Sequence, residues 1–325
     1  MLATTACLGN GIRLENFAYP YPIKIFAFTN QQQPLEMAYM DVPSVGREKG
    51  VVVLLHGKNF SGAYWGRTAE ALSQSGWRVI IPDQIGFGKS SKPANYQYSF
   101  GQLAANTHEL IRSLGINSAV ILGHSMGGML ATRYALIYPE STPALLLIDP
   151  IGLEDWQAKG VPYATPDQLY QDELHQTPDK LRAYEEKNYY AGQWKPEYQT
   201  WVDMVVQFYG SPDYPRMAWN QALTSDMIFT QPVCHEFGNL KMPVLLVVGE
   251  KDHTAIGRER VSEAQGKLLG HYPELGRQAA SVIPNCKLVE LPGAGHVPQV
   301  QMFPEFIRVV RNFLEERTVS NHPKG

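Results

Sequence analysis

The stretch Val120-Ile121-Leu122-Gly123-His124-Ser125-Met126-Gly127-Gly128 decides how this chain can fold. The apolar run that ends at Leu122 predicts a buried strand, and the residues from Met126 to about Tyr138 predict a helix. Gly123 and Gly127 remove side chains where strand and helix crowd each other in the turn between them. The first helical amides favour negative charge at the same place. The pattern predicts a strand–turn–helix unit that presents the Ser125 hydroxyl above a sheet, although an ordinary Gly-rich turn with a surface serine has the same short signature.

Composition excludes several classes of protein. The chain has 325 residues, enough for one large core or for a core plus a smaller domain. The formal net charge is -3, so there is no electrostatic case for nucleic-acid binding. No apolar run approaches the roughly 18 residues that a membrane helix needs. We expect a globular protein that acts on a small molecule, as a monomer or a homodimer.

The cysteines and the N-terminus point to no cofactor and no export signal. Cys7, Cys234 and Cys286 are scattered and odd in number, which argues against a disulfide framework or a zinc site. We therefore expect neither a metal nor an organic cofactor. Residues 1–11 lack a basic region and a long apolar region, so they do not form an intact signal peptide and a cytoplasmic location is the default. The remainder of a trimmed signal is left open for residues 2–7.

Apolar runs alternate with helical patterns along both ends of the chain. This alternation is typical of a mostly parallel sheet with helices on both faces, which is the α/β class. Strands are expected at residues 23–29, 35–42, 51–55, 77–81, 119–122, 144–148, 242–249 and 286–291. Helices are expected from about Tyr64 to Ser75, from the Ser99 N-cap with a capping box to Leu114, and in a long polar region that ends near Val282.

The middle of the chain breaks this rhythm. Residues 153–236 contain no continuous apolar strand and are crowded with tyrosine and tryptophan. We expect a helical cap inserted between two parts of a core, residues 1–152 and 237–317, and a disordered tail at 318–325. The final helix is expected from Pro304 to about Glu316.

Three strand ends carry residues of complementary chemistry, in the order Ser125, Asp252 and His296. The carboxyl ends of parallel strands meet at one edge of a sheet. A serine needs a base to remove its proton, histidine titrates near neutral pH, and a carboxylate orients the histidine. The spacing therefore predicts a nucleophile, an acid and a base in one site.

Together with the elbow, these motifs make the chain resemble the serine hydrolases of the α/β-hydrolase fold that carry a cap. The matching pieces are Leu55-His56-Gly57, Asp83-x-x-Gly86-Phe87-Gly88-x-Ser90, Gly123 to Gly128, Gly249-x-x-Asp252 and Gly295-His296. The resemblance implies an oxyanion hole made by the backbone amides of Met126 and Lys58. Only the amide of Lys58 is implied, because its side chain could equally be solvated.

Other residues compete for the acid and base roles. Asp149 also ends a strand and Glu250 is near Asp252, so both remain alternatives for the acid. His56 fits a structural role in its loop, His124 is the variable residue of the elbow, and His253 adjoins the acid. The Gly86–Gly88 loop lacks the spacing of a phosphate loop, which favours a structural role.

The resemblance implies an esterase that uses an acyl-enzyme intermediate on small to medium, largely apolar substrates. A serine at the elbow argues against haloalkane dehalogenases and epoxide hydrolases, which use aspartate there. Cleavage of a carbon–carbon bond, an amide or a lactone by the same residues stays open, as does a ligand-binding protein of this fold. The aromatic residues of the cap are expected to form its core and a pocket wall. Lys180, Arg182, Lys187 and Lys195 could bind a carboxylate or form a solvated face.

Overall fold

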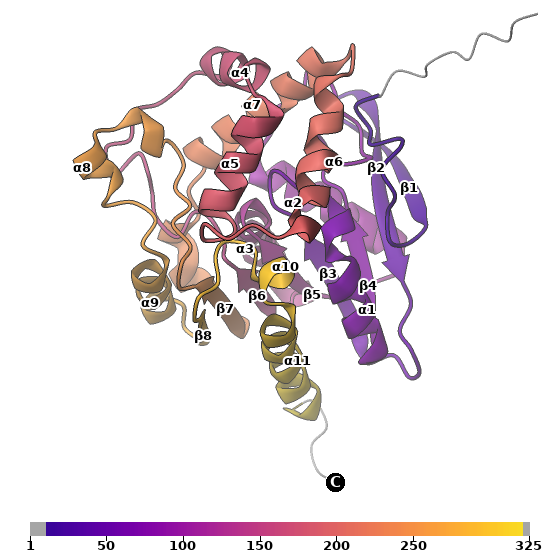
Figure 1. Cartoon of the computed structure of the whole chain (residues 1–325). Helices are drawn as coiled ribbons and strands as arrows, with labels where there is room; N and C mark the ends of the chain where they lie inside the picture. Colours follow the sequence, from indigo (N-terminus) through magenta and orange to yellow (C-terminus); the bar gives the residue numbers. More distant parts are fainter. Residues whose placement is uncertain (1–10, 321–325) are drawn as a thin grey trace, which may run out of the picture.

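The computed structural model describes residues 11–320, and the predictions on the export signal and on Cys7 concern residues outside that range. Its strands form one eight-stranded sheet in the order β1-β2-β4-β3-β5-β6-β7-β8, shown in Figure 1. The β1–β2 and β2–β4 pairs are antiparallel and the other pairs are parallel, which confirms the mostly parallel sheet. The strands are β1 (Ile23–Asn30), β2 (Gln33–Val42), β3 (Gly50–Leu55), β4 (Trp77–Pro82), β5 (Val120–His124), β6 (Leu145–Ile148), β7 (Val244–Gly249) and β8 (Cys286–Leu291).

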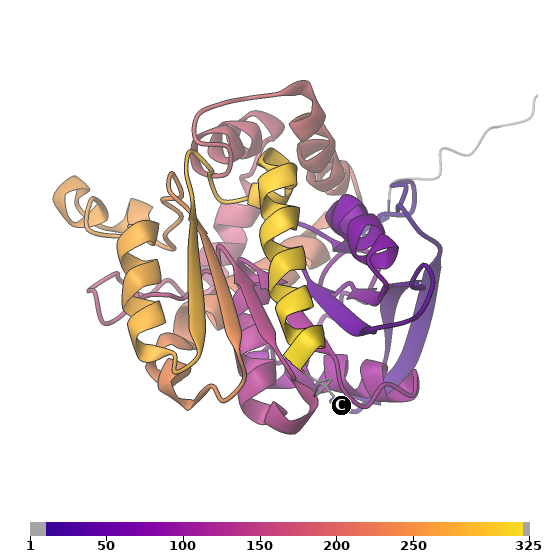
Figure 2. The same cartoon turned by 90° about the horizontal axis from the view of Figure 1, so that it is seen from below.

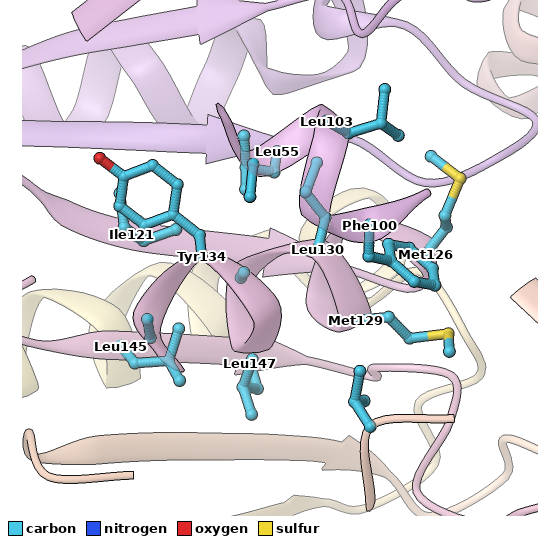
Figure 3. Packing of buried hydrophobic residues seen from close by; sticks show 14 of the residues in the cluster. Leu55, Phe100, Leu103, Ile121, Met126, Met129, Leu130, Tyr134, Leu145 and Leu147 are labelled. Carbon is cyan, nitrogen blue, oxygen red and sulfur yellow. The ribbon is translucent and has the colours of Figure 1, made fainter. Parts of the chain in front are cut away.

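The central strands are apolar throughout because both faces of the sheet are covered. Successive residues of a strand point to opposite faces, so Ile121 packs in one core and Leu122 in the other. Figure 3 shows Tyr134 of α3 (Met126–Ile137) beside Ile121 in the first of these cores. Residues of α2 (Phe100–Ser113) and α9 (Tyr272–Val282) join this core. Residues of α1 (Gly66–Gln74) and α11 (Phe303–Ser320) join the other, and Figure 2 shows α11 in yellow along the sheet.

Some boundaries differ from the predictions for local reasons. The helix expected from Tyr64 begins as a 3-10 turn, η1 (Gly62–Trp65). Ser99 does cap α2 by accepting from the Gln102 N–H. The capping box is incomplete, because the Gln102 side chain donates to Asn106 and does not return to the cap.

The long polar helix predicted up to Val282 is wrong. The segment contains only η5 (Arg258–Arg260), the short α8 (Glu263–Gly266) and α9. Gly257 and Gly270 have φ angles of 77° and 69°, and this left-handed backbone interrupts a helix. The final helix is also longer than predicted, since α10 (Pro298–Gln301) precedes α11 and α11 continues to Ser320. Residues 318–320 are therefore helical, whereas the rest of the predicted tail lies outside the described residues.

The segment between β6 and β7 is helical, as its sequence indicated. Thr165 and Thr177 cap the first two helices, each with a proline at the first helical position. Figure 1 shows the four longer helices of the segment above the carboxyl ends of the central strands. They are α4 (Pro166–Leu174), α5 (Pro178–Asn188), α6 (Gln199–Tyr209) and α7 (Tyr214–Thr230). The segment also contains the 3-10 turns η3 (Pro196–Tyr198) and η4 (Cys234–Asn239), whereas the 3-10 turn η2 (Pro139–Ser141) precedes β6.

Candidate active site

Ser125 occupies a strained turn between β5 and α3. Its φ angle is 57° and its ψ angle is -123°, which is rare for a residue with a side chain. A Cβ atom on Gly123 would lie 2.0 Å from the Gly127 carbonyl oxygen, and one on Gly127 would lie 2.3 Å from the Leu55 carbonyl oxygen. Only glycine fits these two positions, so the motif spacing holds Ser125 at the top of the sheet as predicted.

The structure brings the three predicted side chains together. The distance from His296 Nε2 to Ser125 Oγ is 2.9 Å, and the distance from His296 Nδ1 to Asp252 Oδ2 is 2.6 Å. A carboxylate only accepts, so Nδ1 carries the proton and Nε2 is free to accept from the serine hydroxyl. Asp252 and His296 are fully buried, and Ser125 is 6% exposed. The chain of hydrogen bonds thus ends at a serine that can still be reached.

Asp252 is held in place by its own loop, and Asp149 has a different role. The second Asp252 oxygen accepts from the Thr254 N–H at 2.8 Å. Asp149 Oδ1 accepts from the Gly249 N–H at 2.6 Å, on the neighbouring strand. Burial and the nearby Asp252 carboxylate raise the pKa of Asp149 well above its usual range. Glu250 points elsewhere and accepts from the Gly293 N–H. Of the three candidate acids, Asp252 is the one hydrogen-bonded to His296.

The competing histidines have other partners. His56 Nδ1 donates to the Gly57 carbonyl and its Nε2 accepts from the Gln84 N–H, and burial lowers the pKa of His56. This ring is a neutral structural group, as expected. His253 lines a separate hollow with Arg258 and His271, and does not line the cavity above Ser125.

His124 belongs to a network that sequence reasoning missed. The Gly57 N–H donates to the Tyr64 hydroxyl at 3.1 Å, and that hydroxyl lies 2.9 Å from His124 Nδ1. His124 Nε2 lies 2.7 Å from the His296 carbonyl oxygen, which can only accept. Burial lowers the pKa of His124 well below its usual range, so the ring is neutral and donates through Nε2. No motif links these residues, because they meet only when three strand ends converge.

Two backbone amides flank Ser125. A Cβ atom on Gly57 would lie 3.1 Å from the Ser125 Cβ, so the loop after β3 passes directly beside the serine. Among residues 11–320, the amides of Lys58 and Met126 have no acceptor in the protein. The Lys58 ammonium pairs with Glu173 of α4 at 3.1 Å, and both residues line the cavity above Ser125. The arrangement leaves the two predicted amides available to a negatively charged oxygen.

Ser125 opens into a cavity of about 430 Å³ beneath the helical segment. Its wall includes the aromatic residues Tyr184, Tyr189, Phe208, Tyr209 and Tyr214 from α5, α6, α7 and the loop after α5. Lys180 also lines it. Arg182 and Lys195 instead stack on the rings of Trp194 and Tyr198, and Lys187 is exposed. An apolar space with aromatic walls is typical of a small-molecule site.

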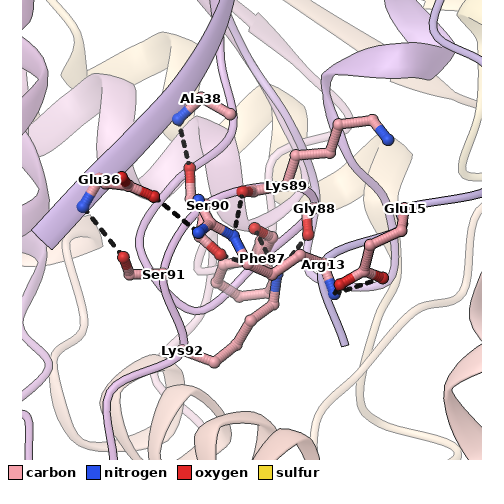
Figure 4. A network of polar contacts seen from close by, with 10 residues as sticks. All are labelled: Arg13, Glu15, Glu36, Ala38, Phe87, Gly88, Lys89, Ser90, Ser91 and Lys92. Atoms are coloured by element: carbon pink, nitrogen blue, oxygen red, sulfur yellow. Dashed lines mark hydrogen bonds and ion pairs between the residues drawn. The ribbon is translucent and has the colours of Figure 1, made fainter. Parts of the chain in front are cut away.

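The loop with Gly86 and Gly88 is a structural part of the cavity wall. Asp83 Oδ1 accepts from the Gly62 N–H, and its Oδ2 accepts from the Lys89 N–H and the Tyr19 hydroxyl. Ser90 Oγ donates to the Asp83 carbonyl and accepts from the Ala38 N–H, and Figure 4 shows this second bond. The buried Lys92 ammonium donates to the carbonyls of Phe87, Gly88 and Ser90. These bonds hold Phe87 and Gly88 against the cavity.

Among residues 11–320, no group of three or more His, Cys, Asp or Glu side chains is placed to hold a metal ion. Within that range, no helix is both long and apolar enough to cross a membrane. Cys234 and Cys286 are free thiols.

The chain belongs to the alpha/beta hydrolase fold family, whose model matches residues 50–301. Lipase 1 of Psychrobacter immobilis is 28% identical over 276 residues, which are 83% of this chain and 78% of that protein. Lipase 3 of Moraxella sp. (strain TA144) is 28% identical over 82% of this chain and 77% of its own length.

Solved structures agree with this membership. A probable hydrolytic enzyme from Pseudomonas aeruginosa PAO1 superposes with a TM-score of 0.91 at 50% identity, over 92% of this chain and 96% of that chain. An esterase from Exiguobacterium antarcticum superposes with a TM-score of 0.68 at 22% identity, over 86% and 96% of the two chains. The second likeness concerns the fold alone. The chain is thus a hydrolase with lipases among its relatives.

Proposed function

We propose that this protein hydrolyses carboxylic esters of small to medium, largely apolar molecules through an acyl-enzyme. The observation that carries the proposal is the unbroken chain of hydrogen bonds from Asp252 through His296 to Ser125, at a strained turn that opens into an apolar cavity. The two related lipases support the choice of bond. Residues 153–236 are proposed as the cap that covers the site.

The first half of the reaction forms the acyl-enzyme. His296 Nε2 takes the proton of Ser125 as Oγ attacks the ester carbonyl carbon. The carbonyl oxygen becomes negative and accepts hydrogen bonds from the amides of Lys58 and Met126. His296 then gives its proton to the departing alkoxide, and Asp252 stabilises the imidazolium in between.

Water completes the cycle. His296 removes a proton from a water molecule, the hydroxide attacks the acyl carbon, and the two amides hold the second oxyanion. The proton returns to Ser125 Oγ as the carboxylic acid leaves. The bonds and protons of both half-reactions balance with the described residues, the ester and one water molecule.

Hydrolysis of p-nitrophenyl esters from acetate to long acyl chains tests the proposal. Wild-type protein should release p-nitrophenol, and Ser125→Ala should lower kcat/KM by several orders of magnitude, on the order of 10⁴ or more. The chain-length optimum reports the space under the cap. Near-full activity in Ser125→Ala would contradict the mechanism. Activity on ring-cleavage products, amides or lactones with none on esters would retain the residues but replace the bond, and tight binding without turnover would indicate a binding protein.

A further inference from the structure

The cavity above Ser125 has mainly apolar and aromatic walls, but polar groups also line it, among them the Lys58–Glu173 ion pair and Lys180. Some of the other polar side chains have no protein partner. Gln221 and Ser225 lie one turn apart on the face of α7 that also carries Met217 and Ile228. Thr254 follows β7 and lines the same cavity. Gln221 is 9% exposed and Thr254 is 5% exposed, so both side chains are more than nine-tenths buried.

Neighbouring polar residues of α7 make a sharp contrast. Asn220 donates to the carbonyls of Pro93 and Arg216 and accepts from the Tyr98 hydroxyl. Thr224 donates to carbonyls of its own helix. The side chains of Gln221 and Ser225 have no hydrogen-bond partner among residues 11–320, and Thr254 Oγ1 is a buried atom without a partner there. On α7, the side chains that face the cavity are therefore unpaired, whereas Asn220 and Thr224 next to them are paired.

Unpaired polar groups discriminate strongly between ligands. A buried polar group that loses water without gaining a partner costs about 1–3 kcal/mol. A ligand that is hydrocarbon along its whole length would impose that cost on Gln221, whereas a ligand with a matching amide, ketone or hydroxyl would not. A site built to pair with a polar group rejects the analogue that lacks it far better than an apolar pocket rejects an extra methylene.

We propose that the cavity selects esters that carry a second hydrogen-bonding group, read by Gln221 with Ser225 of α7. The inference rests on the proposed esterase function and narrows its substrate class from apolar esters to esters with an internal amide, ketone or hydroxyl. Gln221 offers both a donor and an acceptor, so an amide group, which offers both in return, is the best match. The apolar residues around it hold the rest of the chain.

Two esters of equal chain length test the inference. They are p-nitrophenyl heptanoate and the p-nitrophenyl ester of N-acetyl-γ-aminobutyric acid, which replaces part of the alkyl chain by an amide. Rates are divided by those of hydroxide-catalysed hydrolysis to remove intrinsic reactivity. Wild-type protein should favour the amide ester by about tenfold or more in kcat/KM. Gln221→Met, of similar volume, should reduce this preference about tenfold and raise activity on the heptanoate.

Controls separate folding from recognition. Gln171→Met makes the same substitution at an exposed position of α4 that does not line the cavity, and it should keep the wild-type ratio. Gln221→Leu repeats the test if the methionine variant melts early. Hydrolysis of both esters without a preference, or a preference unchanged in Gln221→Met and Gln221→Leu, would overturn this inference alone. Failure to hydrolyse either ester would overturn the proposed function, and the inference with it.

Discussion

At the scale of single residues, the site depends on where each polar group finds its partner. Ser125 is strained, His296 is fixed at both ring nitrogens, and Asp252 accepts from both His296 and the Thr254 N–H. Asp149 lies at the end of the adjacent strand and is kept neutral by burial beside that carboxylate. The two aspartates therefore have opposite charge requirements.

Replacing each aspartate by asparagine should separate their roles. Asp252→Asn removes the charge that orients and stabilises the imidazolium, so kcat should fall by about 10⁴. Asp149→Asn replaces a neutral acid by a neutral amide of the same shape, so kcat should stay within about tenfold of wild type. Steady-state kinetics on p-nitrophenyl butyrate measures both. A loss in Asp149→Asn as large as that in Asp252→Asn would mean that the roles are reversed.

The sequence predicted that Ser125, Asp252 and His296 come together, because each follows a recognisable strand or stands in a glycine-rich loop. It could not choose firmly between Asp252 and Asp149, since both follow buried strands and only the folded loops decide which one reaches His296. The surroundings of the Lys58 side chain were also left open by the sequence. Its pairing with Glu173 joins residues far apart in the chain, and no local pattern encodes that contact.

At the scale of elements, a short network ties three loops together. The Tyr64 hydroxyl accepts from the Gly57 N–H and donates to His124, which in turn donates to the His296 carbonyl. The loop of the proposed oxyanion hole, the elbow strand and the histidine loop are thus held by one tyrosine. Loss of the Tyr64 hydroxyl leaves the buried Gly57 N–H and the buried His124 Nδ1 without this partner.

Tyr64→Phe should lower kcat about tenfold with little change in KM, because the hydrogen bonds position the catalytic loops and make no contact with substrate. Tyr134→Phe is a matched control, since that buried hydroxyl pairs with His108 on another part of the fold. Thermal melting should show similar stability losses for the two variants. Equal kcat values for both would show that the network has no role in turnover.

Prediction at this scale succeeded where the pattern was local and regular. The parallel strands read as continuous apolar runs, and Ser99 marked a helix start. The prediction of one long helix before Val282 failed because the composition of this polar segment suits a helix. The left-handed backbone at Gly257 and Gly270 divides it. The two glycines themselves were the available signal in the sequence.

At the scale of the whole molecule, one buried acid should govern stability in alkaline solution. Glu185 of α5 is fully buried, and both of its carboxylate oxygens lack a partner among residues 11–320. Burial raises the pKa of Glu185 from 4.5 to about 8. The folded protein then keeps a proton that the unfolded chain loses, so the free energy of unfolding falls as pH rises from about 4.5 to 8.

Glu185→Gln removes this titration and should flatten the pH dependence of Tm. The variant should melt at or near the wild-type temperature at pH 5. At pH 8.5 it should melt several degrees above wild type, because glutamine removes the free-energy cost of ionising a buried carboxyl group. Calorimetry across this range is the measurement. Parallel wild-type and variant curves would mean that Glu185 finds a partner or water when ionised.

The largest gap between sequence and structure lies in how the helical segment meets the core. Its helical character and aromatic content were evident, but which rings face the cavity depends on the packing of α5, α6 and α7 over the strand ends. The unpaired Gln221 likewise has no signature in the sequence. Its neighbour Asn220 is also a side-chain amide, and only the folded structure shows that Asn220 is paired and that Gln221 lines the cavity.

The central claim is that Ser125 is a nucleophile, and labelling by a fluorophosphonate tests it most directly. Intact-protein mass spectrometry should show one adduct per chain, and peptide mapping should place it on Ser125. The adduct should be absent from Ser125→Ala, and Asp252→Asn should form it far more slowly. An unlabelled wild-type protein that still hydrolyses esters, or an adduct on another residue, would contradict the account.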